Sequence, residues 1–267
     1  MSVAMPLSCA QQPSTPENVG AQLFQTRTSP SYSICLRPNQ LVDTRVRHEG
    51  RWSDCDTLPE LIQRSAAQAS GNRRLSFVDV GANIGACALL MAAQRHQVLA
   101  LEPVPATYAA LAAGFAANAW PPGVDMRMVN AAASDHVGDG FIQSNVGNAG
   151  DSITAGVGSG LVPWQYWKLP GHQQGRSNFS RHAIRLTTLD HILPLGRPVD
   201  LIKIDTQGHE LRVIRGATNL LRRPRYLGVR TIVFEFYPPA MRLLGDDPVV
   251  LLELLHSHGF SLRSHVK

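Results

Sequence analysis

The stretch Phe77-Val78-Asp79-Val80-Gly81-Ala82-Asn83-Ile84-Gly85 decides the fold class of this chain. Its apolar, β-branched beginning is typical of a buried strand, and its two glycines allow a sharp turn and the close approach of a ligand. Small residues that favour helix follow at positions 86–93. Strand, glycine turn and helix form the first βα unit of an open α/β sheet, in which ligands bind beyond the carboxyl ends of the strands.

The polar residues of this turn indicate which ligand binds there. A dinucleotide site has the pattern G-x-G-x-x-G, whose backbone N–H groups hold a pyrophosphate. Here Asn83 replaces the middle glycine, and the carboxylate of Asp79 stands where a phosphate would bind. S-adenosylmethionine (SAM) carries no phosphate, and its methionyl end bears an ammonium and a sulfonium. The acidic turn therefore favours SAM over NAD; the alternative is a generic Rossmann-like turn with an incidental acid.

A second carboxylate, Glu102, follows the apolar run Gln97–Leu101. It lies about 20 residues past the turn, where an acidic side chain binds the hydroxyls of a ribose. Beyond it, apolar runs and helix-like segments alternate. Strands are predicted at 126–131, 199–205 and 229–236, and helices at 105–118, 210–223 and 248–258. This alternation predicts an α/β fold with a mainly parallel sheet and helices on both faces.

The rest of the chain is less regular. Residues 1–30 are rich in Ser, Thr, Pro and Gln, and we expect them to be disordered. Residues 31–74 are expected to add short strands and a helix over 58–69 before the main domain, which spans 75–267. An insertion at 143–182 carries an aromatic island at 162–167, and is either a floppy surface loop or an ordered lid over the substrate. The chain ends at Lys267, where a strand beginning at Phe260 would form.

Composition excludes several classes of protein. No apolar run approaches the roughly 20 residues of a membrane span. The four cysteines form no C-x-x-C pair, so we expect neither a zinc site nor a disulfide framework, and a reducing, cytoplasmic location. The net charge is +5, but its densest cluster, Arg222, Arg223 and Arg225, falls at a predicted helix end, where cations complement the dipole. Nucleic-acid binding is therefore not indicated.

Seven segments in sequence order resemble the FkbM family of SAM-dependent methyltransferases. These segments are 79–85, 102–103, 129–134, 186–190, 200–210, 214–217 and 234–235. The resemblance implies a Rossmann-like class I methyltransferase fold and methylation of a hydroxyl on a small molecule or sugar, with SAM as the cofactor. The insertion at 143–182 departs from the family, so the identity of the acceptor is not carried over, and the oligomeric state is left open.

The resemblance also implies the cofactor-binding residues. The methionine and ribose side is expected to be lined by Asp79, Gly81, Asn83 and Gly85. Glu102, followed by Pro103, is expected to bind the ribose hydroxyls, and Asn130 with Ala131 to approach the adenine.

Three residues are candidates for acid–base chemistry. Asp205 and Glu235 end predicted strands at the same sheet edge, and His209 titrates near neutral pH, as a general base should. Alternatively, Asp205 caps the next helix, Glu235 is a structural acid, and Glu210 belongs to the first helical turn. No tight acidic cluster requires a metal. Competing functions are an RNA or protein methyltransferase and a SAM-binding module without catalytic activity.

Overall fold

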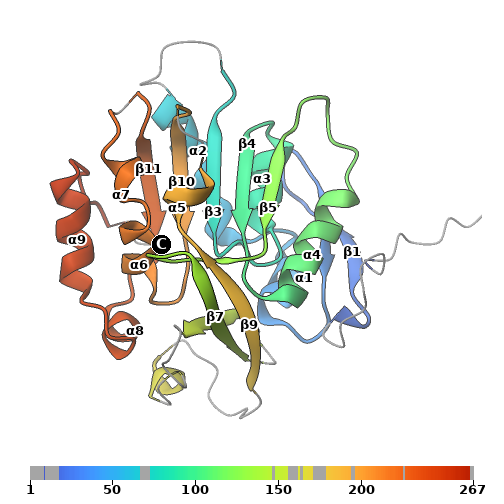
Figure 1. The fold of residues 1–267 in the computed structure, drawn as a ribbon. Coiled ribbons are helices and arrows are strands. Elements are labelled where there is room, and N and C mark those ends of the chain that lie inside the picture. The colour runs from blue at the N-terminus through green and yellow to red at the C-terminus, as the bar shows by residue number, and fades with distance from the viewer. Residues whose placement is uncertain are drawn as a thin grey trace, which may run out of the picture.

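A five-stranded parallel sheet forms the centre of the molecule (Figure 1). The computed structural model describes residues 18–66, 73–145, 148–155, 165–170, 179–193, 196–224 and 226–264, with Cys9 and Val162. The strands are β3 (Ser76–Val80), β4 (Gln97–Leu101), β5 (Met126–Val129), β10 (Val199–Ile204) and β11 (Val229–Phe234), in the order β11-β10-β3-β4-β5. The chain moves from β3 to one side and later returns to the other, so the strand order reverses between β3 and β10. Ligands bind at such switch points.

Helices cover both faces of this sheet, as predicted. Side chains of β3 alternate between the faces, because Phe77 belongs to one buried apolar cluster and Val78 and Val80 to the other. The first cluster contains residues of α2 (Leu58–Ala66), α3 (Ala86–Ala93) and α4 (Pro105–Ala116). The second contains residues of α5 (Leu189–Ile192), α6 (Glu210–Arg215), α7 (Thr218–Leu221) and α9 (Pro248–Ser257). One long helix was expected over 210–223; it is divided at Gly216, where a side chain would overlap the backbone of Ser134.

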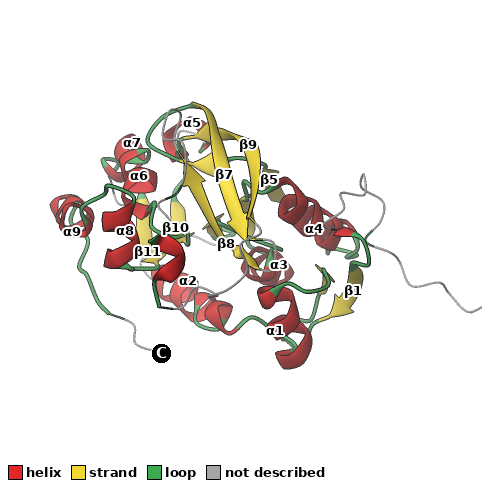
Figure 2. Cartoon of the chain, turned by 90° about the horizontal axis from the view of Figure 1, so that it is seen from below, coloured by secondary structure: helices red, strands yellow, loops and turns green. Residues whose placement is uncertain are grey.

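Part of the segment 143–182, which was predicted to be an irregular insertion, belongs to a second sheet. Its strands are β6 (Ala132–Ala133), β7 (Gly138–Asn145), β8 (Asn148–Ala155) and β9 (Phe179–Thr187), in the order β6-β9-β7-β8 (Figure 2). The expectation of little regular structure was wrong because buried positions here are often polar. Ser144 and Asn148 are buried, for example, and Ser144 is hydrogen-bonded to Ser180 (2.8 Å). Without apolar alternation, the sequence lacks the usual signal of a strand.

The N-terminal extension is ordered from residue 18. Its strands β1 (Gln22–Gln25) and β2 (Ser33–Leu36) form an antiparallel hairpin, so the expected disorder does not extend over 18–30. Residues 1–8 and 10–17 lie outside the described part of the chain. Short strands were predicted near Arg45-Val46-Arg47, but this segment belongs to the helix α1 (Leu41–Glu49). Val42 and Val46, which are buried, have the i, i+4 spacing of one helix face.

Two disulfides contradict the expectation that the cysteines form no framework. Cys9 pairs with Cys35, and Cys55 pairs with Cys87, at sequence separations of 26 and 32. Such separations carry no spacing signal, which is why the sequence did not reveal them. The second bridge ties the short helix η2 (Ser53–Cys55) of the extension to α3, just after the glycine turn. The cysteine-based argument for a cytoplasmic location therefore loses its premise, because disulfides are rare in reducing compartments.

The C-terminal part differs from the prediction in two places. The pair Pro238-Pro239, expected to be a break, begins the helix α8 (Pro238–Leu243), since proline suits the first helical turn. Residues 260–264 form no strand, although one was predicted from Phe260. Across the residues that can be described, no helix has both the length and the apolar character that crossing a membrane requires.

Candidate active site

A cavity of about 340 Å³ lies at the carboxyl ends of the central strands. Its volume is in the range of small-molecule sites, roughly 300–1,000 Å³. One part of the wall comes from the loops after β3, β4, β5, β10 and β11, and comprises Val80–Ile84, Leu101–Pro103, Ala131–Ala133, Asp205–Gln207 and Glu235, with Lys203 and His209. The opposite part comes from α1, η2 and β8, and comprises Leu41, Val42, Arg45, Trp52, Asp54, Asn148–Ser152 and Thr154.

The glycine turn is shaped by the loop that follows β10. Gly81 has φ +79°, and a side chain there would overlap the backbone carbonyl of Asp205. The two loops are also joined by a hydrogen bond from the Asp205 N–H to the Val80 carbonyl (2.9 Å). Asn83 has φ +51°, and its Oδ1 accepts from the Ile84 N–H (2.8 Å), which supports this left-handed conformation. Only glycine fits at position 81, because the backbone of the Asp205 loop lies so close to the turn.

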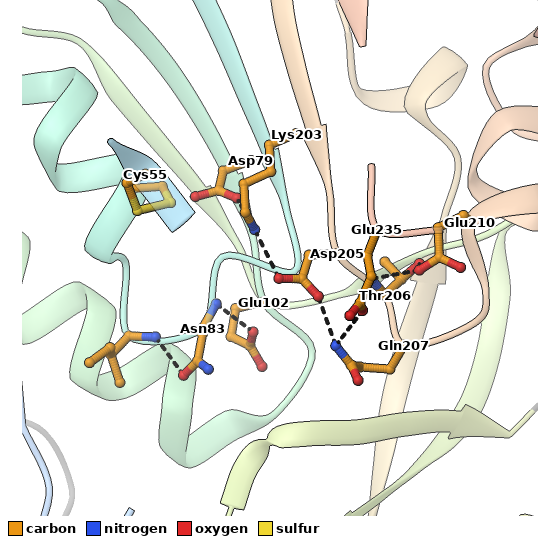
Figure 3. A network of polar contacts seen from close by, with 12 residues as sticks. Cys55, Asp79, Asn83, Glu102, Lys203, Asp205, Thr206, Gln207, Glu210 and Glu235 are labelled. Atoms are coloured by element: carbon orange, nitrogen blue, oxygen red, sulfur yellow. Dashed lines mark hydrogen bonds and ion pairs between the residues drawn. A yellow bond between two sulfur atoms is a disulfide. The ribbon is translucent and has the colours of Figure 1, made fainter. Parts of the chain in front are cut away.

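Glu102 binds the turn from the neighbouring strand. Its Oε2 accepts from the Asn83 N–H (2.9 Å), as Figure 3 shows, and its Oε1 accepts from the Val104 N–H (2.8 Å). Burial raises the pKa of this carboxyl to about 7, although the two N–H donors oppose the rise. Because each oxygen can accept more than one hydrogen bond, Glu102 can also bind hydroxyls of a ligand in the cavity.

Three of the expected cofactor residues lie behind the cavity wall. Gly85 starts α3 with φ +86°, and a side chain there would overlap Leu111. Asn130 is exposed, and its amide donates to the carbonyls of Glu102 (2.8 Å) and Pro103 (3.1 Å). Asp79 is fully buried beneath the wall. These residues hold the loops in place, whereas Gly81, Asn83, Glu102, Pro103 and Ala131 reach the cavity.

Lys203 joins Asp79 to the site. Its Nζ lies 3.3 Å from Asp79 Oδ1 and 3.4 Å from Asp205 Oδ2. Burial lowers the pKa of the ammonium, but the two carboxylates outweigh it and raise the pKa above its ordinary value. Burial also raises the pKa of Asp79, against the effect of Lys203. Sequence reasoning gave Lys203 no role, although a lysine inside a buried strand is itself a signal, because buried lysines are paired.

The three candidate catalytic residues, Asp205, His209 and Glu235, all line the cavity. Asp205 Oδ1 and Glu235 Oε2 both accept from Gln207 Nε2, at 2.8 and 3.0 Å (Figure 3). His209 is 4% exposed, and burial and Arg212 lower its pKa to about 4, so the ring is neutral near pH 7. Desolvation and the carboxylates of Asp205 and Glu210 raise the pKa of Glu235 to about 8, although the residue as a whole is exposed. Gln207, which bridges the acids, matches the family motif in the sequence but was not among the predicted site residues.

Glu210 has a structural role, which was one of the alternatives. Its Oε1 accepts from the Thr206 N–H (3.1 Å), the Thr206 hydroxyl (3.0 Å) and the Gly208 N–H (3.2 Å). It therefore satisfies donors at the start of α6, as acids in the first turn of a helix do. Among the described residues, no group of three or more His, Cys, Asp or Glu side chains is arranged to hold a metal ion.

The described part of the aromatic island is ordered against the site. Tyr166 is fully buried, and its hydroxyl donates to the Gln207 carbonyl (2.9 Å). Pro170 lines the cavity, and its carbonyl accepts from the Tyr237 hydroxyl (3.0 Å). The interpretation as a floppy loop is therefore wrong for residues 165–170. Trp164 lies outside the described residues.

Fold and site together define an α/β protein with a glycine turn and a buried acid at the switch point of a parallel sheet. A family model, the methyltransferase FkbM domain, matches residues 79–262, more than half of the chain. The chain belongs to this family, as the ordered motifs indicated, and is a methyltransferase. Comparison with curated proteins and with solved structures gives no significant match.

Proposed function

We propose that this chain transfers the methyl group of SAM to a hydroxyl of a small molecule or sugar. The observation that carries the proposal is the meeting of the Gly81 turn, Glu102 and Asp205 around one cavity. The turn offers no glycine at position 83 for a pyrophosphate, and acids surround it. SAM, which is cationic and carries no phosphate, suits this wall better than a dinucleotide does.

The residues suit distinct parts of SAM. Backbone groups of the 81–84 turn would hold the methionyl end, and Glu102 would accept from the ribose hydroxyls. Ala131, on the loop after β5, leaves room for the adenine. SAM, when bound, supplies a methyl group activated by its positive sulfur. The chain's own residues orient the acceptor hydroxyl, exclude water and receive its proton.

Glu235 is the proposed proton acceptor. A general base works best when its pKa lies near the working pH, and the pKa of Glu235 is about 8. His209, with a pKa of about 4, is a much weaker base. Asp205 is held by Lys203 and Gln207, which suits a residue that positions the others. This assignment replaces the sequence-based preference for His209.

Calorimetric titration with SAM and with S-adenosylhomocysteine (SAH) tests the cofactor directly. We expect binding of both, and no binding at millimolar concentration would refute the proposal. Transfer of labelled methyl groups to a panel of sugars and small alcohols then tests the acceptor class. Transfer to RNA, with an affinity that falls steeply with salt, would instead support the alternative of an RNA methyltransferase. Binding without transfer to any acceptor class would indicate an inactive SAM-binding module.

A further inference from the structure

Two carboxylates are held side by side at one end of the cavity. Asp205 and Glu235 follow β10 and β11, which are adjacent parallel strands, with Ile204 paired to Phe234. The Gln207 amide donates to both acids, at 2.8 and 3.0 Å (Figure 3). Gln207 is itself fixed, since it has φ +57° and its carbonyl accepts from Tyr166. The chain therefore holds two carboxyl groups close together rather than letting them separate.

The surroundings of Glu235 are mostly negative. Besides Asp205, the carboxylates of Glu210 on α6 and Asp54 on η2 raise its pKa, and Lys203 on β10 opposes them. The ammonium of Lys203 already contacts Asp79 and Asp205. Two phenols also face this group, because Glu235 raises the pKa of Tyr166 on η3 (Tyr166–Lys168) and of Tyr237 before α8. A further cation beside the pair would relieve this repulsion.

A second, independent observation concerns a buried residue that lines the same cavity. His209 lines the cavity and is 4% exposed, and its Nε2 has no hydrogen-bond partner among the described residues. A buried polar atom without a partner is costly, so native proteins provide one. The cavity next to His209, Asp205 and Glu235 is thus shaped to receive a polar, cationic group.

We propose that the Asp205–Glu235 pair, bridged by Gln207, recognises the charge of the cofactor and so favours SAM, with its cationic sulfonium, over the neutral thioether SAH. The proposal rests on the proposed function. SAM and SAH share their adenosine and amino-acid parts and differ by a methyl group and one positive charge. A site whose affinity depends on this charge binds the substrate SAM more tightly than the product SAH.

The charge balance of the reaction fits this role. As the acceptor oxygen forms its bond to the methyl carbon, the carbon–sulfur bond breaks and its electron pair stays on sulfur. The hydroxyl proton passes to ionised Glu235. The positive charge of the sulfur and the negative charge of the carboxylate thus disappear in the same turnover.

The test is the ratio of SAM to SAH affinity as a function of pH, measured by calorimetry on the full chain. A cation beside Glu235 favours its ionised form and lowers its pKa in the SAM complex, so SAM binds more tightly as the pH rises through about 8. If the pKa falls by about one unit, the ratio rises roughly fivefold between pH 6.5 and 8.5. Effects of pH on the binding of the adenosine part, which SAM and SAH share, cancel in the ratio of the two affinities.

Glu235→Gln keeps the shape of the side chain and removes the charge, so it should flatten this rise. Glu253→Gln, on the exposed face of α9, is the matched control and should behave as wild type. Asp54→Asn retains Glu235 but removes a negative charge that raises its pKa. In this variant the midpoint of the rise in the SAM-to-SAH affinity ratio should therefore move to lower pH. If SAH fails to bind wild type, the proposed function itself fails. If SAH binds but the ratio is independent of pH, or rises equally in Glu235→Gln, the charge-recognition proposal is overturned.

Discussion

The two sides of the cavity are built in different ways. The side formed by the loops of the central sheet uses short, continuous motifs, such as the 81–85 turn and the Lys203-Ile204-Asp205 strand end. The opposite side joins α1 and η2, which are neighbours in sequence, to the distant strand β8, and η2 is held by the Cys55–Cys87 disulfide. The first side is fixed by backbone geometry and the second by long-range contacts. We therefore expect substitutions on the first side to weaken cofactor binding and those on the second to loosen the site.

The largest expected effect is that of Gly81→Ala. The new side chain would overlap the Asp205 carbonyl as well as requiring φ +79°. The matched control is Gly245→Ala, where φ is +84° but no atom lies within 4 Å of the added carbon. The control should cost about 1–2 kcal/mol of folding free energy, the strain of a left-handed residue. Gly81→Ala should cost more and weaken SAH binding by more than about 100-fold, as calorimetry and thermal unfolding would measure. Equal effects in the two variants would show that the close approach of Asp205 does not matter.

The same contrast explains what the sequence could predict. The strand, turn and helix around Gly81 follow one another in sequence, so local patterns identified them, together with Glu102 and the Asp205 strand. The cysteine pairs and the polar strands β7 and β8 depend on residues that meet only in the folded chain. Asp43 of α1 is buried in an ion pair with Arg37, which precedes the helix (3.1 Å), and a buried polar residue of this kind obscures the apolar pattern of the helix face. Patterns of one short segment do not encode these contacts.

Removing the Cys55–Cys87 bridge should affect the second side. A disulfide that closes a loop of this length contributes about 2–4 kcal/mol to stability. The Cys55→Ser/Cys87→Ser variant should unfold at lower temperature, and hydrogen exchange should increase in residues 41–56. The control is Cys9→Ser/Cys35→Ser, since neither of those cysteines lines the cavity whereas Cys87 does. We expect the two variants to differ in exchange around η2, and identical exchange there would argue against a local role for the bridge.

Glu102→Gln should weaken SAH binding about tenfold, because a charged acceptor gives hydrogen bonds worth about 1.5–3 kcal/mol. The variant also tests the effect of pH. The ionised carboxylate is the better acceptor for ribose hydroxyls, and burial raises its pKa to about 7. SAH affinity in the wild type should therefore increase as the pH rises through 7, and in Glu102→Gln this increase should vanish. If the wild type and Glu102→Gln show the same dependence of SAH affinity on pH, Glu102 does not bind the ribose.

The smallest expected effect is that of Tyr166→Phe, which probes how closely the two sides depend on each other. The substitution keeps the buried ring and removes the hydrogen bond to the Gln207 carbonyl (2.9 Å). Denaturant titration should show a loss of about 0.5–1.5 kcal/mol. Tyr32→Phe, which likewise keeps a buried ring and loses a bond to the Ala86 carbonyl (2.6 Å), is the control. If Tyr166 supports the bridge between Asp205 and Glu235, the Phe variant at 166 alone should reduce the SAM preference over SAH at pH 8.5. An unchanged preference would mean that each side of the cavity holds its residues independently.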